Sequence, residues 1–217
     1  MSYTGEVQVG GPADVQDAGD LEITKFAVGD LANNVYLLRC TLTDERVIID
    51  AADDAERILA ELDGSPVARI VTTHWHPDHW QALAAVIEST GAETVAGAVD
   101  AEHIAVPTDT PVSTGARVRV GSCELEVIEV RGHTDGSIVL AYDDPDGVVH
   151  LFTGDSLFPG GVGKTWSEED FRTLIDEVEA KIFDRYPDDT HFYPGHGNDS
   201  TLGTERPDLA QWRERGW

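Results

Sequence analysis

The chain has 217 residues, of which 41% are hydrophobic, so it has enough apolar material for the core of one large domain or of two closely packed halves. Its net charge of −26, from 41 acidic and 15 basic residues, would repel phosphate backbones and anionic membranes, which argues against a nucleic-acid or membrane partner. No apolar run approaches the roughly 18 residues that a bilayer crossing requires.

Residues 1–20 are polar, glycine-rich and acidic, and they show neither the basic start nor the apolar stretch of a signal peptide. We therefore expect a flexible or edge segment here, followed by one domain over residues 21–217 in a cytoplasmic protein. Cys40 and Cys123 match no metal-binding or redox spacing, so we expect buried thiols, which suits a reducing cytoplasm.

The first half of the chain is predicted to alternate strands with helices. Helices are indicated by apolar spacing such as that of Ile58, Leu59 and Leu62, and strands by short β-branched or alternating runs. Strands are expected over residues 21–28, 34–42, 46–49, 70–73 and 94–96, and helices over residues 54–62 and 80–87.

The second half is predicted to contain two hairpins and the clearest helix. Residues 116–130 form one expected hairpin, and residues 138–142 and 148–153 form the other around a turn rich in Asp, Pro and Gly. Residues 168–183 carry a regular apolar face, and a polar tail is expected after the last glycine-rich loop. Two rounds of strands followed by helix predict a layered α/β fold.

The hexapeptide of residues 74–79 holds four side chains that can bind a metal, namely His74, His76, Asp78 and His79. His74 and His76 would point the same way from a strand end, because side chains along a strand alternate with a period of two. Pro77 fits the first turn of a helix, from which Asp78 and His79 would project. Imidazole and carboxylate suit Zn²⁺ and related ions, so the hexapeptide predicts a metal site.

Further ligands would have to come from other segments of the chain. His133, Asp155 and His196 each follow an apolar strand and lie in a glycine-flanked loop, where the backbone can approach a metal closely. Taken singly, His133 and Asp155 are as readily explained as ordinary turn residues. Together with the hexapeptide they favour one site.

The ordered set of Asp50, the hexapeptide, His133, Asp155 and His196 resembles the five motifs of the metallo-β-lactamase superfamily, over residues 34–197. The resemblance implies a four-layer αββα sandwich, with the metal site at one edge between two sheets. It also implies that His74, His76 and His133 hold one ion, that Asp78, His79 and His196 hold a second, and that Asp155 bridges them. Asp50 would orient a ligand or the bridging water, with a helix cap as the alternative.

Within that superfamily, the segments Gly-Asp-Ser-Leu-Phe at 154–158 and Tyr-Pro-Gly-His-Gly at 193–197 look most like the glyoxalase II group of thioesterases. This resemblance implies two divalent ions, most readily Zn²⁺, with Fe or Mn as alternatives. It implies hydrolysis of a small acyl-thiol or related ester by a metal-bridging hydroxide held at Asp78 and Asp155. Lys164 would meet a substrate carboxylate, or else be simply solvated. We expect a monomer or a small homo-oligomer.

The same motifs leave other activities on this fold open. A mononuclear Fe(II) persulfide dioxygenase has a nearly identical motif set and would use His74 or His76 with His133 and Asp155. A phosphodiesterase or nuclease fits the acidic surface poorly. A non-catalytic binding protein is disfavoured because no ligand position is lost.

The excess of acidic residues, with only three lysines in the chain, predicts adaptation to high salt. The melting temperature should therefore rise between low and molar salt, because counterions screen the repulsion between surface carboxylates. Thermal melts at the two salt concentrations measure this. Equal melting temperatures would indicate an ordinary acidic protein.

Overall fold

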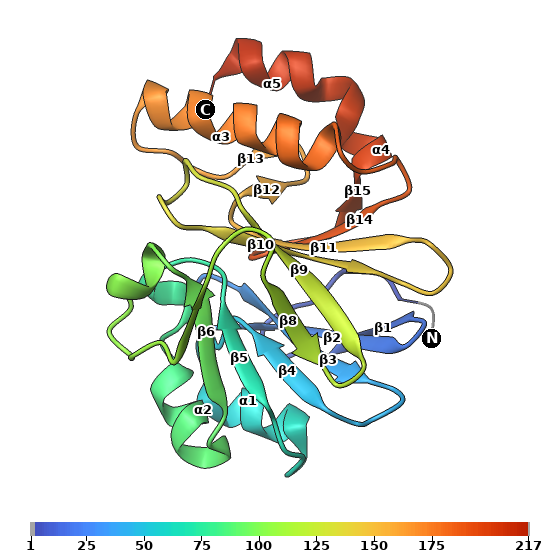
Figure 1. Cartoon of the computed structure of the whole chain (residues 1–217), viewed down its shortest axis with the longest axis vertical. Helices are drawn as coiled ribbons and strands as arrows, with labels where there is room; N and C mark the ends of the chain where they lie inside the picture. The colour runs from blue at the N-terminus through green and yellow to red at the C-terminus, as the bar shows by residue number, and fades with distance from the viewer. Residues whose placement is uncertain (1–2, 217) are drawn as a thin grey trace.

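The computed structural model describes residues 3–216, which form two β-sheets packed face to face, with helices on both outer faces (Figure 1). This is the four-layer αββα sandwich that the sequence predicts, in one domain. Those parts of the domain prediction that concern residues 1, 2 and 217 lie outside the described residues.

The first sheet contains seven strands in the order β1-β2-β3-β4-β5-β6-β7. Strands β1 to β4 pair antiparallel, and β4 to β7 pair parallel. The N-terminal segment supplies the edge strand β1. The strands are β1 (Asp14–Ala18), β2 (Leu21–Val28), β3 (Asn33–Cys40), β4 (Arg46–Ile49), β5 (Arg69–Thr72), β6 (Glu93–Gly97) and β7 (Thr110–Val112).

The second sheet contains six strands in the order β15-β14-β11-β10-β9-β8, of which only β11 and β14 pair parallel. A two-stranded ribbon, β12 (Leu157–Phe158) with β13 (Gly161–Val162), lies beside it. The strands of the sheet are β8 (Arg117–Val120), β9 (Cys123–Glu129), β10 (Ile138–Asp143), β11 (Val149–Gly154), β14 (His191–Pro194) and β15 (Ser200–Thr201).

Three apolar clusters hold the four layers together. The central one fills the space between the sheets, where Tyr36, Phe152 and Tyr193 pack ring against ring. Cys40 and Cys123 lie in this layer as buried free thiols, as expected. The two outer clusters join each sheet to its helices, and burial of their apolar faces is what stabilises the helices.

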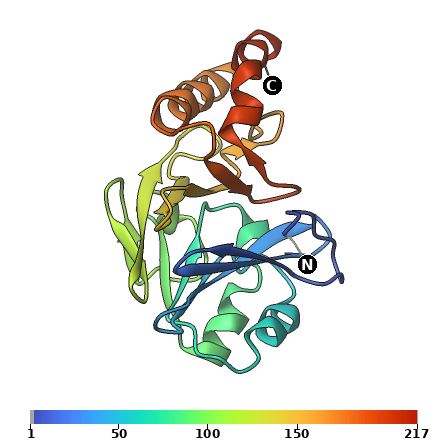
Figure 2. The ribbon, with the colours of Figure 1, turned by 90° about the vertical axis from the view of Figure 1, so that its right-hand side faces the viewer.

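Helices α1 (Ala55–Leu62) and α2 (Leu83–Thr90) cover the first sheet, and α3 (Glu168–Val178) and α5 (Leu209–Arg215) cover the second (Figures 1 and 2). The short helix α4 (Leu202–Glu205) leads into α5. None of the helices described within residues 3–216 is long and apolar enough to span a bilayer.

Several predicted boundaries were wrong, for identifiable reasons. Helix α2 begins three residues later than expected, because the backbone N–H groups of Gln81 and Ala82 donate to the loop after β4. The helix predicted over residues 168–183 leaves α geometry after Val178 and continues as a π turn, Glu179–Phe183, that keeps Ile182 and Phe183 buried. Strand β3 stops at Cys40, two residues before the predicted end.

The C-terminal region also differs from its predicted form. Instead of a polar tail, it forms α4 and α5, and Trp212 is buried against Phe183. A few apolar residues among many charged ones give too weak a periodicity to indicate a helix, and the surface that they pack against lies far away in the sequence.

Lys25 in β2 connects the first sheet to a loop of the second. Its side chain is fully buried, and Nζ donates to Asp199 Oδ1 at 2.6 Å, to the Gly197 carbonyl at 2.8 Å and to the Gly5 carbonyl at 2.7 Å. Burial lowers the pKa of Lys25 and raises that of Asp199, although each group favours the charged form of the other. The pair therefore holds the segment 197–199, which directly follows His196.

Replacing Lys25 alone should destabilise the protein strongly. In Lys25→Met, Asp199 keeps its burial but loses its counter-charge, which costs about 3–5 kcal/mol of unfolding free energy. Urea unfolding monitored by circular dichroism measures the loss. The double variant Lys25→Met with Asp199→Leu should recover most of it, and a single variant as stable as the wild type would contradict this account.

Candidate metal centre

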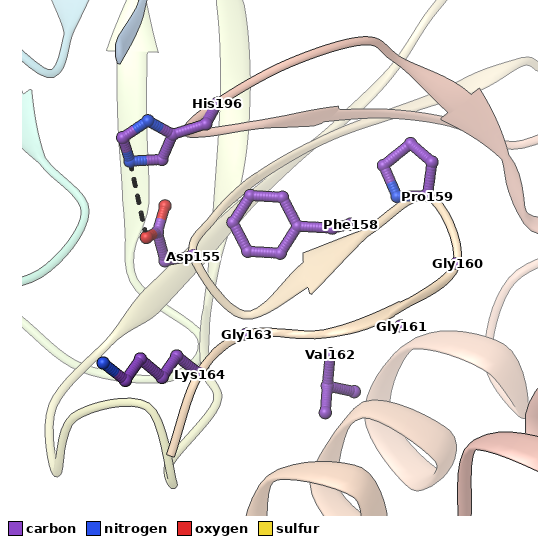
Figure 3. Close-up of a pocket in the computed structure, with 9 residues that line it drawn as sticks. All are labelled: Asp155, Phe158, Pro159, Gly160, Gly161, Val162, Gly163, Lys164 and His196. Carbon is purple, nitrogen blue, oxygen red and sulfur yellow. Dashed lines mark ion pairs between the residues drawn. The ribbon is translucent and has the colours of Figure 1, made fainter. Parts of the chain in front are cut away.

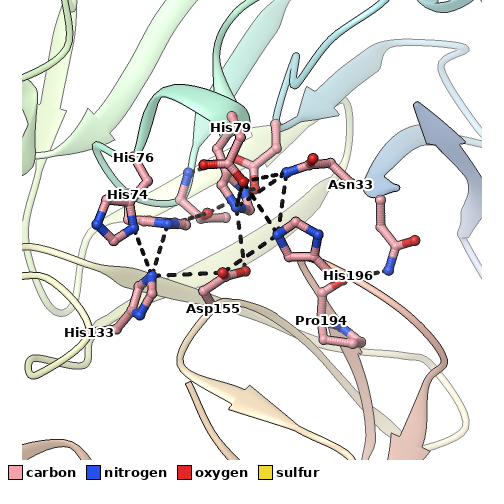
Figure 4. Close-up of polar contacts among 12 residues, drawn as sticks. Asn33, His74, His76, His79, His133, Asp155, Pro194 and His196 are labelled. Carbon is pink, nitrogen blue, oxygen red and sulfur yellow. Dashed lines mark hydrogen bonds and ion pairs between the residues drawn. The ribbon is translucent and has the colours of Figure 1, made fainter. Parts of the chain in front are cut away.

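The strand ends of both sheets converge at one edge of the sandwich and carry the predicted site residues there. Asp50 follows β4, His74 follows β5, Asp155 follows β11 and His196 follows β14. A short 3-10 helix, Pro77–His79, turns the hexapeptide as its proline predicts, so that Asp78 and His79 point back toward the strand ends. The seven predicted ligands come together (Figure 4).

Three histidines form the first cluster. His133 Nε2 lies 3.2 Å from His74 Nε2 and 2.9 Å from His76 Nδ1. Tetrahedral zinc with Zn–N bonds of about 2.0–2.1 Å would separate its nitrogens by roughly 3.3 Å. The three nitrogens therefore suit one zinc-like ion with a small adjustment.

The second cluster consists of Asp78, His79 and His196. Asp78 Oδ2 lies 3.4 Å from His79 Nε2 and 3.4 Å from His196 Nε2. Asn33, which sequence reasoning did not find, places its amide nitrogen 2.9 Å from the same Asp78 oxygen.

Asp155 lies between the two clusters. Its Oδ1 is 3.4 Å from His79 Nε2, and its Oδ2 is 3.6 Å from His196 Nε2 and 3.7 Å from His133 Nε2. Asp155 Oδ1 is buried and has no hydrogen-bond partner among residues 3–216. A buried carboxylate oxygen without a donor is costly unless a cation compensates it, so this atom fits a metal site.

The ring protons of four histidines are directed away from the clusters. His79 Nδ1 donates to Asp50 Oδ2 at 2.9 Å, His196 Nδ1 to the Leu31 carbonyl at 3.1 Å, and His133 Nδ1 to the Lys164 carbonyl at 2.7 Å. His74 Nδ1 donates to Thr73 Oγ1 at 3.1 Å, because that hydroxyl already donates its own proton to a hydrogen bond with Asp50. Each Nε2 is left with a lone pair that faces the metal centre.

Asp50 does not cap a helix, since Asp54 caps α1. It accepts from the Thr73 backbone N–H at 2.7 Å, from the Thr73 hydroxyl at 2.8 Å and from His79. Its backbone adopts a left-handed φ of 58°. Asp50 therefore orients two metal-facing histidines, one of them through Thr73.

Burial and neighbouring charges shift the pKa values of the histidines in opposite directions in the two clusters. Burial and the adjacent histidines hold the pKa of His74 well below its usual value, and they lower that of His76 to about 4. Burial also opposes protonation of His79, but Asp155 and Asp50 outweigh it and raise its pKa well above the usual value. Burial opposes ionisation of Asp78, yet His196, His79 and Asn33 lower its pKa, so it is a carboxylate.

Two glycines allow other parts of the chain to approach Asp155 closely, and one of them, Gly195, lies in a loop for which a close approach was predicted. A Cβ at Gly195 would collide with Asp155 Oδ1, and one at Gly163 would collide with the Asp155 carbonyl. Any larger residue at either position would push Asp155 out of place.

Lys164 borders the site in two ways. Its carbonyl accepts the His133 proton, whereas its exposed side chain lies over the Trp166 ring, with Nζ 4.5 Å from the ring centroid. The carbonyls of Leu31 and Lys164 leave no signature in a sequence, because every residue has one. Asn33 and Thr73 could not be recognised from the sequence either, because their residue types are common and most of their partners lie in other segments.

Comparison with known proteins agrees with this geometry. The family model described as metallo-beta-lactamase superfamily matches residues 28–204. A hydroxyacylglutathione hydrolase of Polaromonas sp. is 36% identical over 163 residues, which make up 74% of this chain but only 60% of that enzyme. An uncharacterized protein of Aquifex aeolicus is 30% identical over 85% of this chain and 93% of its own length.

Among solved structures, ETHE1 from Myxococcus xanthus superposes with a TM-score of 0.76 at 27% identity, over 88% of this chain and 84% of that one. The sandwich, the ordered ligand motifs and the match over residues 28–204 lead to one conclusion: the chain belongs to the metallo-beta-lactamase superfamily.

Proposed function

We propose that the protein is a binuclear metal-dependent hydrolase that cleaves a thioester or related acyl ester of a small molecule. The observation that carries the proposal is the buried Oδ1 of Asp155, which has no hydrogen-bond partner within residues 3–216 and lies between two clusters of ligand-type side chains. Two divalent cations, Zn²⁺ being best suited to these ligands, would supply Lewis-acid activation of water and of the substrate carbonyl.

The contribution of the chain itself is orientation. Hydrogen bonds from Nδ1 hold four imidazole rings in the tautomer that can bind a cation. Asp155 supplies one carboxylate to both clusters, and burial keeps bulk water from His74 and His133 of the first. No further protein base is required, and we assign none.

A pocket of about 360 Å³ opens directly beside Asp155 and His196 (Figure 3). Phe158 and Val162 give it apolar walls, and Lys164 stands at its edge. An apolar pocket with one cation suits a small acyl-thiol that carries a carboxylate. The likeness to hydroxyacylglutathione hydrolases supports thioester chemistry, while their greater length leaves the thiol carrier open.

The alternative, a mononuclear Fe(II) persulfide dioxygenase, would use His74 or His76 with His133 and Asp155. It would need no second ion at Asp78, His79 and His196, although their ligand atoms also lie within 4.8 Å of one another. Because the motif sets of the two enzymes are nearly identical, metal content and oxygen consumption separate them, rather than the ligand residues.

Metal content and one substitution test the proposal together. The wild type should bind about two zinc-like ions per chain and hydrolyse members of a panel of thioesters and lactones. Asp155→Ala should lower metal occupancy and reduce hydrolysis by at least about 100-fold, because the shared carboxylate is lost. Elemental analysis and thioester hydrolysis assays measure both.

Asp146→Ala, which removes an exposed turn aspartate, serves as the matched control and should behave as the wild type. Full turnover in Asp155→Ala would refute the proposal. One iron per chain with oxygen consumption on glutathione persulfide would instead establish the dioxygenase.

The two clusters should lose their ions at different pH values. At the second cluster, Asp155, Asp50 and Asp78 outweigh burial and raise the pKa values of His79 and His196, so protons compete with the ion at a higher pH than for an ordinary histidine. At the first cluster, the lowered values, about 4 for His76, delay competition to much lower pH. Zinc titrations against a chromophoric chelator from pH 8 to pH 5 should show the second ion weakening first. Loss of both ions in parallel would contradict this order.

A further inference from the structure

Asn33 lies beside the second cluster but is not one of the seven predicted metal ligands. It is 2% exposed, it begins β3, and its backbone forms an isolated antiparallel bridge with His196. Its amide therefore has little freedom to swing away. Figure 4 shows the amide directed at the imidazoles of His79 and His196.

A single nitrogen of Asn33 contacts all three ligand atoms of the second cluster. Nδ2 lies 2.9 Å from Asp78 Oδ2, 3.4 Å from His196 Nε2 and 3.5 Å from His79 Nε2. The Asp78 carboxylate is an acceptor, and in the neutral rings both Nε2 atoms are acceptors because the Nδ1 protons are committed elsewhere. An amide NH₂ group, with two protons and no lone pair, is the neutral group that complements such a cluster.

We propose that Asn33 is a positioning residue of the second metal site, whose NH₂ group gathers Asp78, His79 and His196 before a cation binds. This inference rests on the proposed binuclear function. Without this donor the Asp78 carboxylate would lose its shortest hydrogen bond, and neutral imidazoles beside it would present only lone pairs to it, which favours separation of the three groups. When a cation takes the histidine lone pairs, the hydrogen bond to Asp78, the shortest of the three contacts, still orients the carboxylate.

The neighbouring asparagine shows that this role belongs to one position. Asn34 Nδ2 donates to the backbone carbonyls of Pro194 and Gly197, both at 2.9 Å. Consecutive residues of an extended chain point in opposite directions, so β3 supports the backbone of the His196 loop with one asparagine and the ligand atoms with the other.

Two substitutions at position 33 remove the amide donor, but only Asn33→Asp supplies a carboxylate that can itself bind the ion. Asn33→Ala should weaken the second ion by about 10–100-fold and leave the first unchanged. Asn33→Asp should lower the melting temperature of the metal-free protein, because a second carboxylate stands beside Asp78, yet bind the second ion at least as tightly as the wild type. Stepwise Zn²⁺ titration, Co²⁺ absorption spectra and melts of the chelated protein give these readouts without an activity assay.

Asn198→Ala provides the control, because it removes an exposed asparagine two residues beyond His196 and should keep wild-type affinities. The inference is overturned if Asn33→Ala binds both ions normally or if it weakens both equally. A wild-type protein that binds fewer than two ions would instead refute the proposed binuclear function.

Discussion

The metal centre depends on the positions of the imidazole ring protons, which hydrogen bonds fix before any ion binds. An imidazole offers a lone pair on Nε2 only if its proton stays on Nδ1, and it stays there when Nδ1 has a fixed acceptor. Two of those acceptors are backbone carbonyls, those of Leu31 and Lys164. The path of the backbone sets the positions of these two carbonyls. The fold therefore determines which ring nitrogen of His133 and of His196 carries the proton. The carbonyl of Lys164 would serve this purpose whatever side chain stood there.

The same constraint ties the centre to the packing of the two sheets. His196 belongs to the second sheet, but its loop is held by the first. The Asn34 backbone N–H donates to the Gly195 carbonyl at 2.7 Å, and the Tyr36 hydroxyl donates to the Pro194 carbonyl at 2.6 Å. Sliding of one sheet over the other would break these bonds and separate the second ligand cluster. Apolar burial between the sheets therefore maintains the spacing of ligand atoms as well as the stability of the domain.

The sequence allowed the layered fold and the convergence of the seven site residues to be predicted, because both depend on local signals. Apolar periodicity marks strands and helices, and an ordered set of ligand-type residues after strands is rare by chance. The features that could not be predicted depend on contacts between segments that are distant in the sequence. The contact of Asn33 with His196 spans 163 residues, and helix α5 is stabilised through Trp212 by a surface formed elsewhere. The offset start of α2 likewise follows from two hydrogen bonds to the loop after β4.

The charge of the chain bears on what such a centre can bind. A surface with a net charge of −26 concentrates cations and repels anions, which favours loading of divalent ions and disfavours an anionic substrate. Two of the three lysines are committed, Lys25 to Asp199 and Lys181 to Glu177. Within residues 3–216, Lys164 is paired with an aromatic ring and with no carboxylate. If the substrate carries a carboxylate, as we propose, attraction toward this protein has to act at short range, inside the pocket that Lys164 borders. High salt would then weaken the general repulsion more than this contact, because screening acts most strongly on charges that are far apart.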